Sequence, residues 1–423
     1  MTAVRRGTGE LALPLACYPE KSESTSGILL HGDSEELLGR LAESHASSVR
    51  FVFIDPPYNT GNSELLYPDS FERTDWVLML KRCFLACRPL LSSRASIAVT
   101  IDDREMPYLR IMMDHIFGES SMVACVAYER SGSAGLGQAG VILNTKEYVL
   151  IYSLDRSSLN DIGSEKPVDR QIMQRYNKIL RVPGRREPIE EFASRSGNLV
   201  RLYRHEGCII EPVSLRNFEY RREEIGAVYH DNFELIFRSQ NVQKENTFQN
   251  EIIARLDKKS FYSVDYIPRR GRYRGREKTL YYYNGELCAW LKDSATVRGG
   301  ELVKRNKLTD IWTHADIPKA DLANEGGVTF PRSKKPEHLL YRLISMTTDP
   351  GDLVLDYFAG SGTTCAVAHK MGRRYIGIEK GDFFESILVQ RMKHVVEGDP
   401  TGVSKLAGFT GGGSFAYSLS PDL

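Results

Sequence analysis

At 423 residues, the chain is long enough for two or three domains, or for one large domain with an insertion. Its hydrophobic content of 41%, charged content of 26% and net charge of +1 are those of an ordinary soluble globular protein. Residues 1–10 lack the apolar core of a signal peptide, and no run approaches the roughly 18 apolar residues of a membrane span, so we expect a cytoplasmic protein with no membrane segment.

The first part of the chain predicts alternating strands and helices after a polar, irregular N-terminal extension over residues 1–26. A short apolar strand (GILLH) is followed by a helix with leucines at 37, 38 and 41, for which Asp33 or Ser34 is the expected N-cap. Further strands are predicted over 49–55, 95–102, 121–129 and 147–154, and further helices over 76–91 and 107–117.

The strand over 49–55 runs into the turn Asp55-Pro56-Pro57-Tyr58. Prolines cannot donate to a sheet ladder, so the strand must end here. Asp55 and the Pro56 carbonyl then form two hydrogen-bond acceptors at one point, and Tyr58 places a flat ring beside them. Two acceptors and a stacking ring match a planar heterocycle with an exocyclic amino group. A helix-capping aspartate before a proline turn is the alternative interpretation.

Residues 156–328 are polar and basic, with weak periodicity. Within them, residues 251–310 carry 14 Lys and Arg against 8 Asp and Glu, which is typical of a confined contact with a polyanion. A solvated basic loop is the alternative for any single arginine. The cluster as a whole predicts phosphate contacts or guanine readout, and its members are Arg269, Arg270, Arg272, Arg274, Arg276 and Lys278.

The α/β pattern resumes after residue 328 with a helix over 335–346 and a strand that ends in Asp356. A glycine loop follows, where backbone can approach a ligand closely and a helix N-terminus offers unpaired N–H groups. Glu379 ends the next strand, at the spacing of a carboxylate that binds a ribose diol. The loop residues that we assign to cofactor binding are Phe358, Ala359, Gly360, Ser361, Gly362 and Thr363.

S-Adenosylmethionine is the expected cofactor of this loop. The rival is a nicotinamide dinucleotide, but GSGTTC lacks the third glycine of a pyrophosphate-binding loop, and Asp356 would repel a phosphate. The remaining segments are a helix over 384–396 and residues 401–423, which look like a flexible tail.

The seven cysteines are scattered and form no CxxC pair, and the histidines show no ligand spacing, so no metal site is expected. Cys83 and Cys87 are four residues apart in a predicted helix, which suits packing on one face. Apolar, unalternating strands between helices predict an α/β domain with a mostly parallel sheet, interrupted by a long insertion.

The motifs, taken together and in order, resemble the β class of DNA amino-methyltransferases, and especially the modification subunits of type III restriction–modification systems. The matching stretches are DPPYNTG at 55–61, SIAVTIDDREMPYL at 96–109, KEYVLIY at 146–152, FPRSKKPEHLLYRLI at 330–344 and VLDYFAGSGTT at 354–364.

This resemblance implies a circularly permuted Rossmann-like fold that binds S-adenosylmethionine. Its catalytic half is residues 27–155, its target-recognition insertion residues 156–328 and its cofactor half residues 329–400. It also implies that Asp33 and Lys335 belong to the cofactor site. The implied reaction is methylation of the amino group of an adenine flipped out of duplex DNA, with Asp55, Pro56, Pro57 and Tyr58 as catalytic residues.

Double-stranded DNA, a restriction subunit and a second copy of the chain in a homodimer are the implied partners. Cytosine amino-methylation uses the same geometry and stays open, as does a catalytically silent DNA-binding subunit. The sequence leaves undecided the recognition sequence, the oligomeric state and the presence of a nuclease partner.

Overall fold

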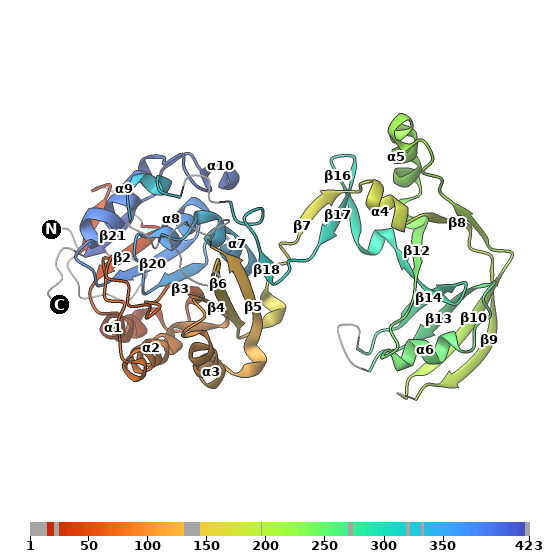
Figure 1. The fold of residues 1–423 in the computed structure, drawn as a ribbon, viewed down its shortest axis with the longest axis horizontal. Coiled ribbons are helices and arrows are strands. Elements are labelled where there is room, and N and C mark those ends of the chain that lie inside the picture. Colours follow the sequence, from red (N-terminus) through yellow and green to blue (C-terminus); the bar gives the residue numbers. More distant parts are fainter. Residues whose placement is uncertain are drawn as a thin grey trace. The chain divides into compact units, whose positions relative to one another are not determined.

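The computed structural model describes residues 15–20, 25–130, 144–195, 197–269, 274–318, 322–330 and 334–418. The chain divides into two compact units, which Figure 1 shows as a ribbon. One consists of Met1–Ile162 with Thr309–Leu423, and the other of Gly163–Leu308. The second unit is therefore shorter at both ends than the insertion expected over residues 156–328.

The first unit is built on a mixed sheet of ten strands in the order β1-β21-β2-β20-β19-β3-β4-β6-β5-β18. Neighbours from β2 to β4 run parallel, and β6 runs antiparallel between β4 and β5. The strands are β1 (Leu15–Tyr18), β2 (Gly27–His31), β3 (Val49–Ile54), β4 (Leu91–Ile101), β5 (Met122–Glu129), β6 (Lys146–Ser153), β18 (Ile311–Trp312), β19 (Leu353–Asp356), β20 (Arg374–Glu379) and β21 (Phe415–Ser418).

Helices cover both faces of this sheet, as the unbroken apolar strands predicted (Figure 1). One face carries α1 (Ser34–His45), α2 (Arg73–Cys87) and α3 (Met106–Phe117). The other carries α7 (Glu337–Thr347), α8 (Thr363–Lys370) and α9 (Gln390–Glu397), which continues a π-helical segment over Phe384–Val389. Asp33 caps α1 as expected, because its carboxylate accepts hydrogen bonds from the Glu35 and Glu36 amides at 3.0 and 3.4 Å.

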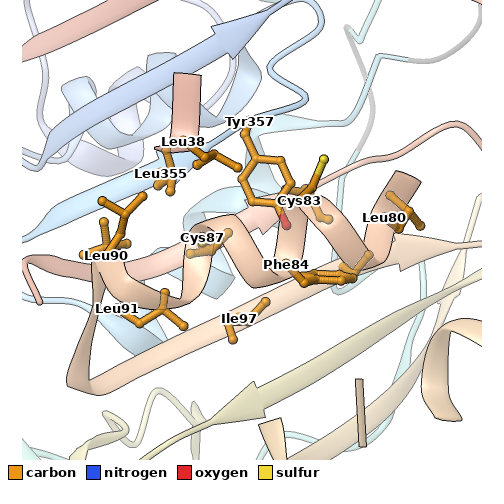
Figure 2. Close-up of a cluster of buried hydrophobic side chains, with 14 of the residues drawn as sticks. Leu38, Leu80, Cys83, Phe84, Cys87, Leu90, Leu91, Ile97, Leu355 and Tyr357 are labelled. Carbon is orange, nitrogen blue, oxygen red and sulfur yellow. The ribbon is translucent and has the colours of Figure 1, made fainter. Parts of the chain in front are cut away.

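The core beneath α2 contains the two cysteines that the helical spacing placed on one face (Figure 2). Cys83 and Cys87 are buried with Phe84 and Tyr357. Burial raises the pKa of Cys83 to about 12 and raises that of Cys87 as well. Both thiols are therefore protonated packing groups.

The expected flexible tail is wrong for residues 401–418. They form α10 (Ser404–Ala407) and then β21, which lies between β1 and β2 with Phe415 fully buried. The three glycines before β21 have φ values of 117°, 96° and 82°, and a Cβ on Gly413 would lie 2.7 Å from the His369 ring. The glycines thus form a constrained turn that returns the chain to the sheet.

The N-terminal extension, expected to be irregular, likewise contains a strand, because Leu15–Tyr18 pair with β21. The expectation fails here because β1 and β21 have four residues each, too few for a periodic pattern to be read.

The second unit is rich in antiparallel strands, which the weak periodicity of residues 156–328 did not reveal. Its larger sheet has eight strands in the order β11-β8-β12-β15-β14-β13-β10-β9, and its smaller sheet has three in the order β16-β17-β7. The strands are β7 (Ser164–Pro167), β8 (Lys178–Val182), β9 (Arg185–Ala193), β10 (Leu199–Glu206), β11 (Ile209–Pro212), β12 (Ile236–Gln240), β13 (Phe261–Tyr266), β14 (Lys278–Tyr283), β15 (Glu286–Trp290), β16 (Ala295–Arg298) and β17 (Glu301–Asn306).

Three short helices accompany these sheets: α4 (Arg170–Arg175), α5 (Arg222–Asp231) and α6 (Thr247–Ile253). Ile252 of α6 packs with Val200, Val264 and Tyr282 from the larger sheet. In the described parts of both units, no helix has the length and apolar character needed to cross a membrane.

The burial of β21 generates a test of stability. Phe415→Ala is expected to lower the free energy of unfolding by about 3–5 kcal/mol, because a fully buried ring is removed. Leu406→Ala, in α10, is the control, since that side chain is 56% exposed and its loss should cost less than about 0.5 kcal/mol. Urea denaturation measures both. Equal, small effects would contradict the placement of β21 in the sheet.

Candidate active site

Three neighbouring parallel strands bring the two sequence motifs to one edge of the sheet. In the register, Leu355 of β19 lies opposite Val52 of β3, and Asp356 lies opposite Gly377 of β20. The carboxyl ends of β3, β19 and β20 therefore meet, and they carry Asp55, Asp356 and Glu379. Ligands bind at this edge in open α/β sheets.

The Asp55 carboxylate is held by a donor on each oxygen. Thr100 Oγ1, on β4, donates to Oδ1 at 2.6 Å, and Lys335 Nζ donates to Oδ2 at 2.7 Å. Pro56 is buried behind it, and the Pro57 carbonyl accepts a hydrogen bond from Trp76 Nε1 at 2.7 Å. The turn is thus fixed to β4 and α2.

The segment after the turn is fastened by two side chains. Asp69 accepts hydrogen bonds from the backbone amides of Asn59 and Thr60 at 2.9 and 3.0 Å. Asn59 adopts φ 58°, a left-handed conformation that asparagine tolerates, and its side chain accepts from the Phe71 amide at 2.7 Å. This fixes the loop over residues 59–71.

Lys335 lies at the turn over residues 55–58, between two carboxylates. Besides its 2.7 Å contact with Asp55, its Nζ is 3.5 Å from Glu147 Oε2 and 5.0 Å from the Tyr58 ring centre. Tyr58 donates its hydroxyl to the same Glu147 oxygen at 3.1 Å. Burial alone would lower the pKa of Lys335, but the Asp55 and Glu147 charges raise it above its usual value, so this side chain is an ammonium.

The glycine loop is organised around two carboxyl groups, of which that of Asp356 is buried and that of Glu379 is partly buried. Asp356 accepts hydrogen bonds from the Phe358 amide at 3.0 Å and from Thr364 Oγ1 at 2.5 Å. Glu379 accepts from the amides of Gly360 and Gly381, each at 2.7 Å. Gly362 precedes α8 with φ 80°, and a Cβ there would lie 2.8 Å from Leu388, so both conformation and space demand glycine.

A buried ionic network supports this loop from behind. Arg391 donates to Thr363 Oγ1 and to Ser361 Oγ at 2.8 and 3.2 Å, and also to Glu337 Oε1 at 2.8 Å. Lys370 Nζ donates to Glu337 Oε2 at 2.8 Å and to Asp399 at 2.6 Å. The network ties the loop to α7, the helix that Lys335 precedes by two residues.

Two cavities meet at the Asp55–Lys335 pair. The first, of about 420 Å³, contains eight of the ten predicted cofactor residues: Lys335, Asp356, Phe358, Ala359, Gly360, Ser361, Thr363 and Glu379. The second, of about 440 Å³, is lined by Tyr58, Tyr128 and Glu147. Asp55, Lys335 and Tyr67 line both.

Two predicted cofactor residues lie elsewhere. Gly362 is the N-cap position of α8, and Asp33 lines a neighbouring hollow of about 480 Å³ with Glu379 and Lys380. Lys380 Nζ donates to Asp33 at 3.1 Å.

The sequence interpretation missed several groups of the site. Glu147 and Thr100 stand within stretches matched to the methyltransferase pattern, but no spacing rule marked their roles. Phe330 belongs to another matched stretch, and its ring lies edge-on to Phe383 at 5.3 Å. Asp382 lies three residues after Glu379, and residues 66–71 lie shortly after the stretch at 55–61, so closeness in sequence was the one local signal available.

The predicted basic cluster belongs to the hairpin between β13 and β14, in the second unit. Tyr266 pairs with Lys278 at its base, and Arg269, Arg274 and Arg276 are exposed. Arg270 and Arg272 lie outside the described residues. The tyrosines that follow are largely packing groups, since Tyr282 is fully buried and Tyr281 stacks on Phe261. Across the described ranges, no group of His, Cys, Asp or Glu is arranged to hold a metal ion.

Comparison with known proteins gives matches that cover most of the chain. The model of the N6/N4 family described as DNA methylase matches residues 49–390. The probable type III restriction–modification enzyme HindVI Mod subunit of Haemophilus influenzae is 32% identical over 93% of this chain and 54% of its own length. The StyLTI Mod subunit of Salmonella typhimurium is 26% identical over 81% of this chain and 50% of its own length.

The type II methyltransferase M.KpnI of Klebsiella pneumoniae is 24% identical over 86% of this chain and 81% of its own length. The chain thus spans about half the length of the two Mod subunits and most of M.KpnI.

The burial of Asp356 generates a pH-dependent prediction. Burial raises the pKa of Asp356 to about 7, although the hydrogen bonds from Thr364 and Phe358 lower it. Because folding raises this pKa, the stability contributed by the protonated carboxyl is complete below about pH 4 and is lost as the pH rises through 7.

Asp356→Asn removes this titration. Between about pH 5 and 8, the free energy of unfolding of the wild type should fall relative to the variant by on the order of a few kcal/mol. Urea denaturation across this range measures the difference. Burial also raises the pKa of Glu325 to about 7, but this residue is present in both proteins, so its contribution cancels in the difference between the two curves. Parallel pH curves would contradict the assignment.

Proposed function

The chain belongs to the DNA methylase family, and on this basis we propose that it transfers a methyl group from S-adenosylmethionine to the exocyclic amino group of a flipped-out adenine in duplex DNA. The observation that carries the proposal is the meeting of two cavities at Asp55: one is lined by the glycine loop, and the other by Tyr58 and Glu147. A reaction between two bound molecules needs such an arrangement.

The residues of the first cavity fit S-adenosylmethionine. A volume of about 420 Å³ lies in the range of cofactor sites. Its lining carries the carboxyl groups of Asp55, Asp356, Glu379 and Asp382 against the ammonium groups of Lys335 and Lys380. The excess of carboxyl groups, which remains even with Asp356 protonated, favours a cationic ligand over a phosphate. Glu379 would hold the ribose, and the glycine loop the amino-acid end. When bound, this cofactor supplies an electrophilic methyl group.

The second cavity would receive the target base. Asp55 and the Pro56 carbonyl would accept hydrogen bonds from its amino group and so localise the nitrogen lone pair, while Tyr58 would stack on the ring. Among the described residues, no protein group donates to the Pro56 carbonyl, which leaves it available as an acceptor. The amino nitrogen would then face the first cavity in line with the methyl group.

The order of strands supports a circular permutation. The strand that carries the glycine loop, β19, follows β3 by some 300 residues in the sequence, yet the two are neighbours in the sheet. Joining the chain in a different place would make β19 the first strand and, with the short strands β21 and β1 left out of the count, β3 the fourth, without altering the sheet. We therefore keep the permuted methyltransferase fold as part of the proposal.

The second unit is proposed to recognise the target sequence, with the exposed arginines of the β13–β14 hairpin as DNA contacts. Because two relatives are named Mod subunits of type III restriction–modification enzymes, a restriction subunit is a proposed partner. A homodimer and a cytoplasmic location, beside the DNA, complete this proposal. Sequencing that detects modified bases distinguishes adenine from cytosine as the target.

Asp55→Ala should abolish methyl transfer, because the variant lacks one acceptor for the target amino group. Binding of S-adenosylmethionine, measured by calorimetry, should persist, since the glycine loop and Glu379 are unchanged. Glu36→Gln, on the exposed side of α1, is the control and should retain full activity. Near-normal turnover by the Asp55→Ala variant would contradict the proposed role of this residue. Failure of the wild type to bind S-adenosylmethionine would overturn the proposed cofactor.

The triple variant of Arg269, Arg274 and Arg276 to Ala should weaken binding to every duplex and flatten its salt dependence. Each lost phosphate contact reduces the slope of log affinity against log salt by about 0.9. If one arginine reads a guanine, its loss instead costs roughly 1–3 kcal/mol on the cognate site alone. Arg40, Lys81 and Arg88, exposed in the first unit, provide a charge-matched control. Unchanged slopes and unchanged discrimination would exclude this hairpin from DNA binding.

A further inference from the structure

Glu147 is a buried carboxylate that the roles assigned above leave unused. It lies on β6, where it pairs with Tyr128 of β5, and its side chain is 5% exposed. Its Oε2 atom accepts the Tyr58 hydroxyl at 3.1 Å and lies 3.5 Å from Lys335 Nζ. One oxygen therefore faces the two groups that flank Asp55.

We propose that Glu147 is a positioning residue for methyl transfer, which acts by fixing Lys335 and Tyr58 on either side of Asp55. This inference rests on the proposed function and names a further residue of the same site. Lys335 and Asp55 line both cavities, whereas Glu147 lines only the second, so its effect falls on the base and not on the cofactor.

Charge explains why a carboxylate is needed at this position. Lys335 and Asp55 are a close pair whose charges cancel, with side chains 9% and 17% exposed. Glu147 leaves this cluster one negative charge in excess. Arg130 approaches the other Glu147 oxygen to 3.8 Å, but its side chain is 55% exposed and water screens the attraction.

The excess charge lies where the reaction requires it. As the bond from the amino nitrogen to the methyl carbon forms, the bond from that carbon to sulfur breaks and sulfur keeps the electron pair. Positive charge thereby moves onto the amino nitrogen, which then loses a proton through the Asp55 carboxylate to water. A preorganised negative cluster beside the nitrogen stabilises this charge.

Geometry gives a second reason. Without the Glu147 charge, the Lys335 ammonium would have Asp55 as its one close anionic partner among the described residues, and the Tyr58 ring would lose its charged anchor. The ammonium would then compete with the target amino group for Asp55 Oδ2. Glu147 thus attracts the Lys335 ammonium as well, and Asp55 Oδ2 stays accessible to the target amino group.

The test is a double-mutant cycle of Glu147→Gln and Lys335→Met, with tritiated S-adenosylmethionine and PCR-amplified genomic DNA, which carries no methylated bases. Glutamine keeps an acceptor for the Tyr58 hydroxyl and removes only the charge. Glu147→Gln should slow single-turnover methyl transfer by up to about 100-fold, as expected of lost alignment. The affinity of this variant for S-adenosylmethionine, measured by calorimetry, should stay within about twofold of the wild type, because Glu147 does not line the first cavity.

The coupling between the two substitutions distinguishes a positioning role of Glu147 from a general disruption of the site. With Lys335→Met already present, adding Glu147→Gln should cost less rate than it does in the wild type, because one of the two groups that Glu147 fixes is absent. Lys146→Met is the matched control: it is the neighbouring residue on β6, paired with Asp103 at the surface, and should leave the rate unchanged. A wild-type rate for Glu147→Gln, or effects that multiply in the double variant, would overturn the inference.

Thermal denaturation provides an arm that does not depend on activity. Lys335→Met should lower the Tm, because it leaves two buried carboxylates without their cation, and adding Glu147→Gln should restore part of the loss. No recovery would overturn the Lys335–Glu147 coupling. If the double variant shows this recovery of Tm but the wild-type protein transfers no methyl group, the result counts against the proposed function instead. The two failures are therefore distinguishable.

Discussion

The parallel pairing of β19 with β3 on one side and β20 on the other is the constraint on which the site depends. It sets the ends of three strands side by side and so brings Asp55, Asp356 and Glu379 to one edge. A one-residue slip in either pairing would turn every side chain of a strand to the opposite face. Because these strands are buried on both faces, their apolar packing makes such a slip costly.

Burial of charge is the second organising feature. The Glu337–Arg391–Lys370 network is fully buried, and removing one member would leave an uncompensated charge in the interior. Arg391 also donates to Ser361 and Thr363, so the same ions fix the glycine loop. Stability of this half of the sheet and the shape of the first cavity are therefore linked through one set of hydrogen bonds.

The site itself combines groups that would repel one another if they were brought together alone. Asp55 and Glu147 tolerate proximity because the Lys335 ammonium lies between them. Asp356 lines the first cavity together with Asp55, and burial raises its pKa to about 7.

The sequence by itself determined the elements whose signals are local. Apolar strands that end in DPPY and in the glycine loop, the Asp33 cap and the common face of Cys83 and Cys87 follow from spacing and propensity, and the structure confirms each of them as local structure. The tertiary structure decided what depends on contacts distant in sequence. Lys335 meets Asp55 and Glu147 across some 280 and 190 residues, and β21 joins β1 and β2 through strands too short to show a period. A local sequence pattern cannot predict which distant carboxylate lies next to a lysine, because the pairing of strands and the burial that accompanies it determine that contact.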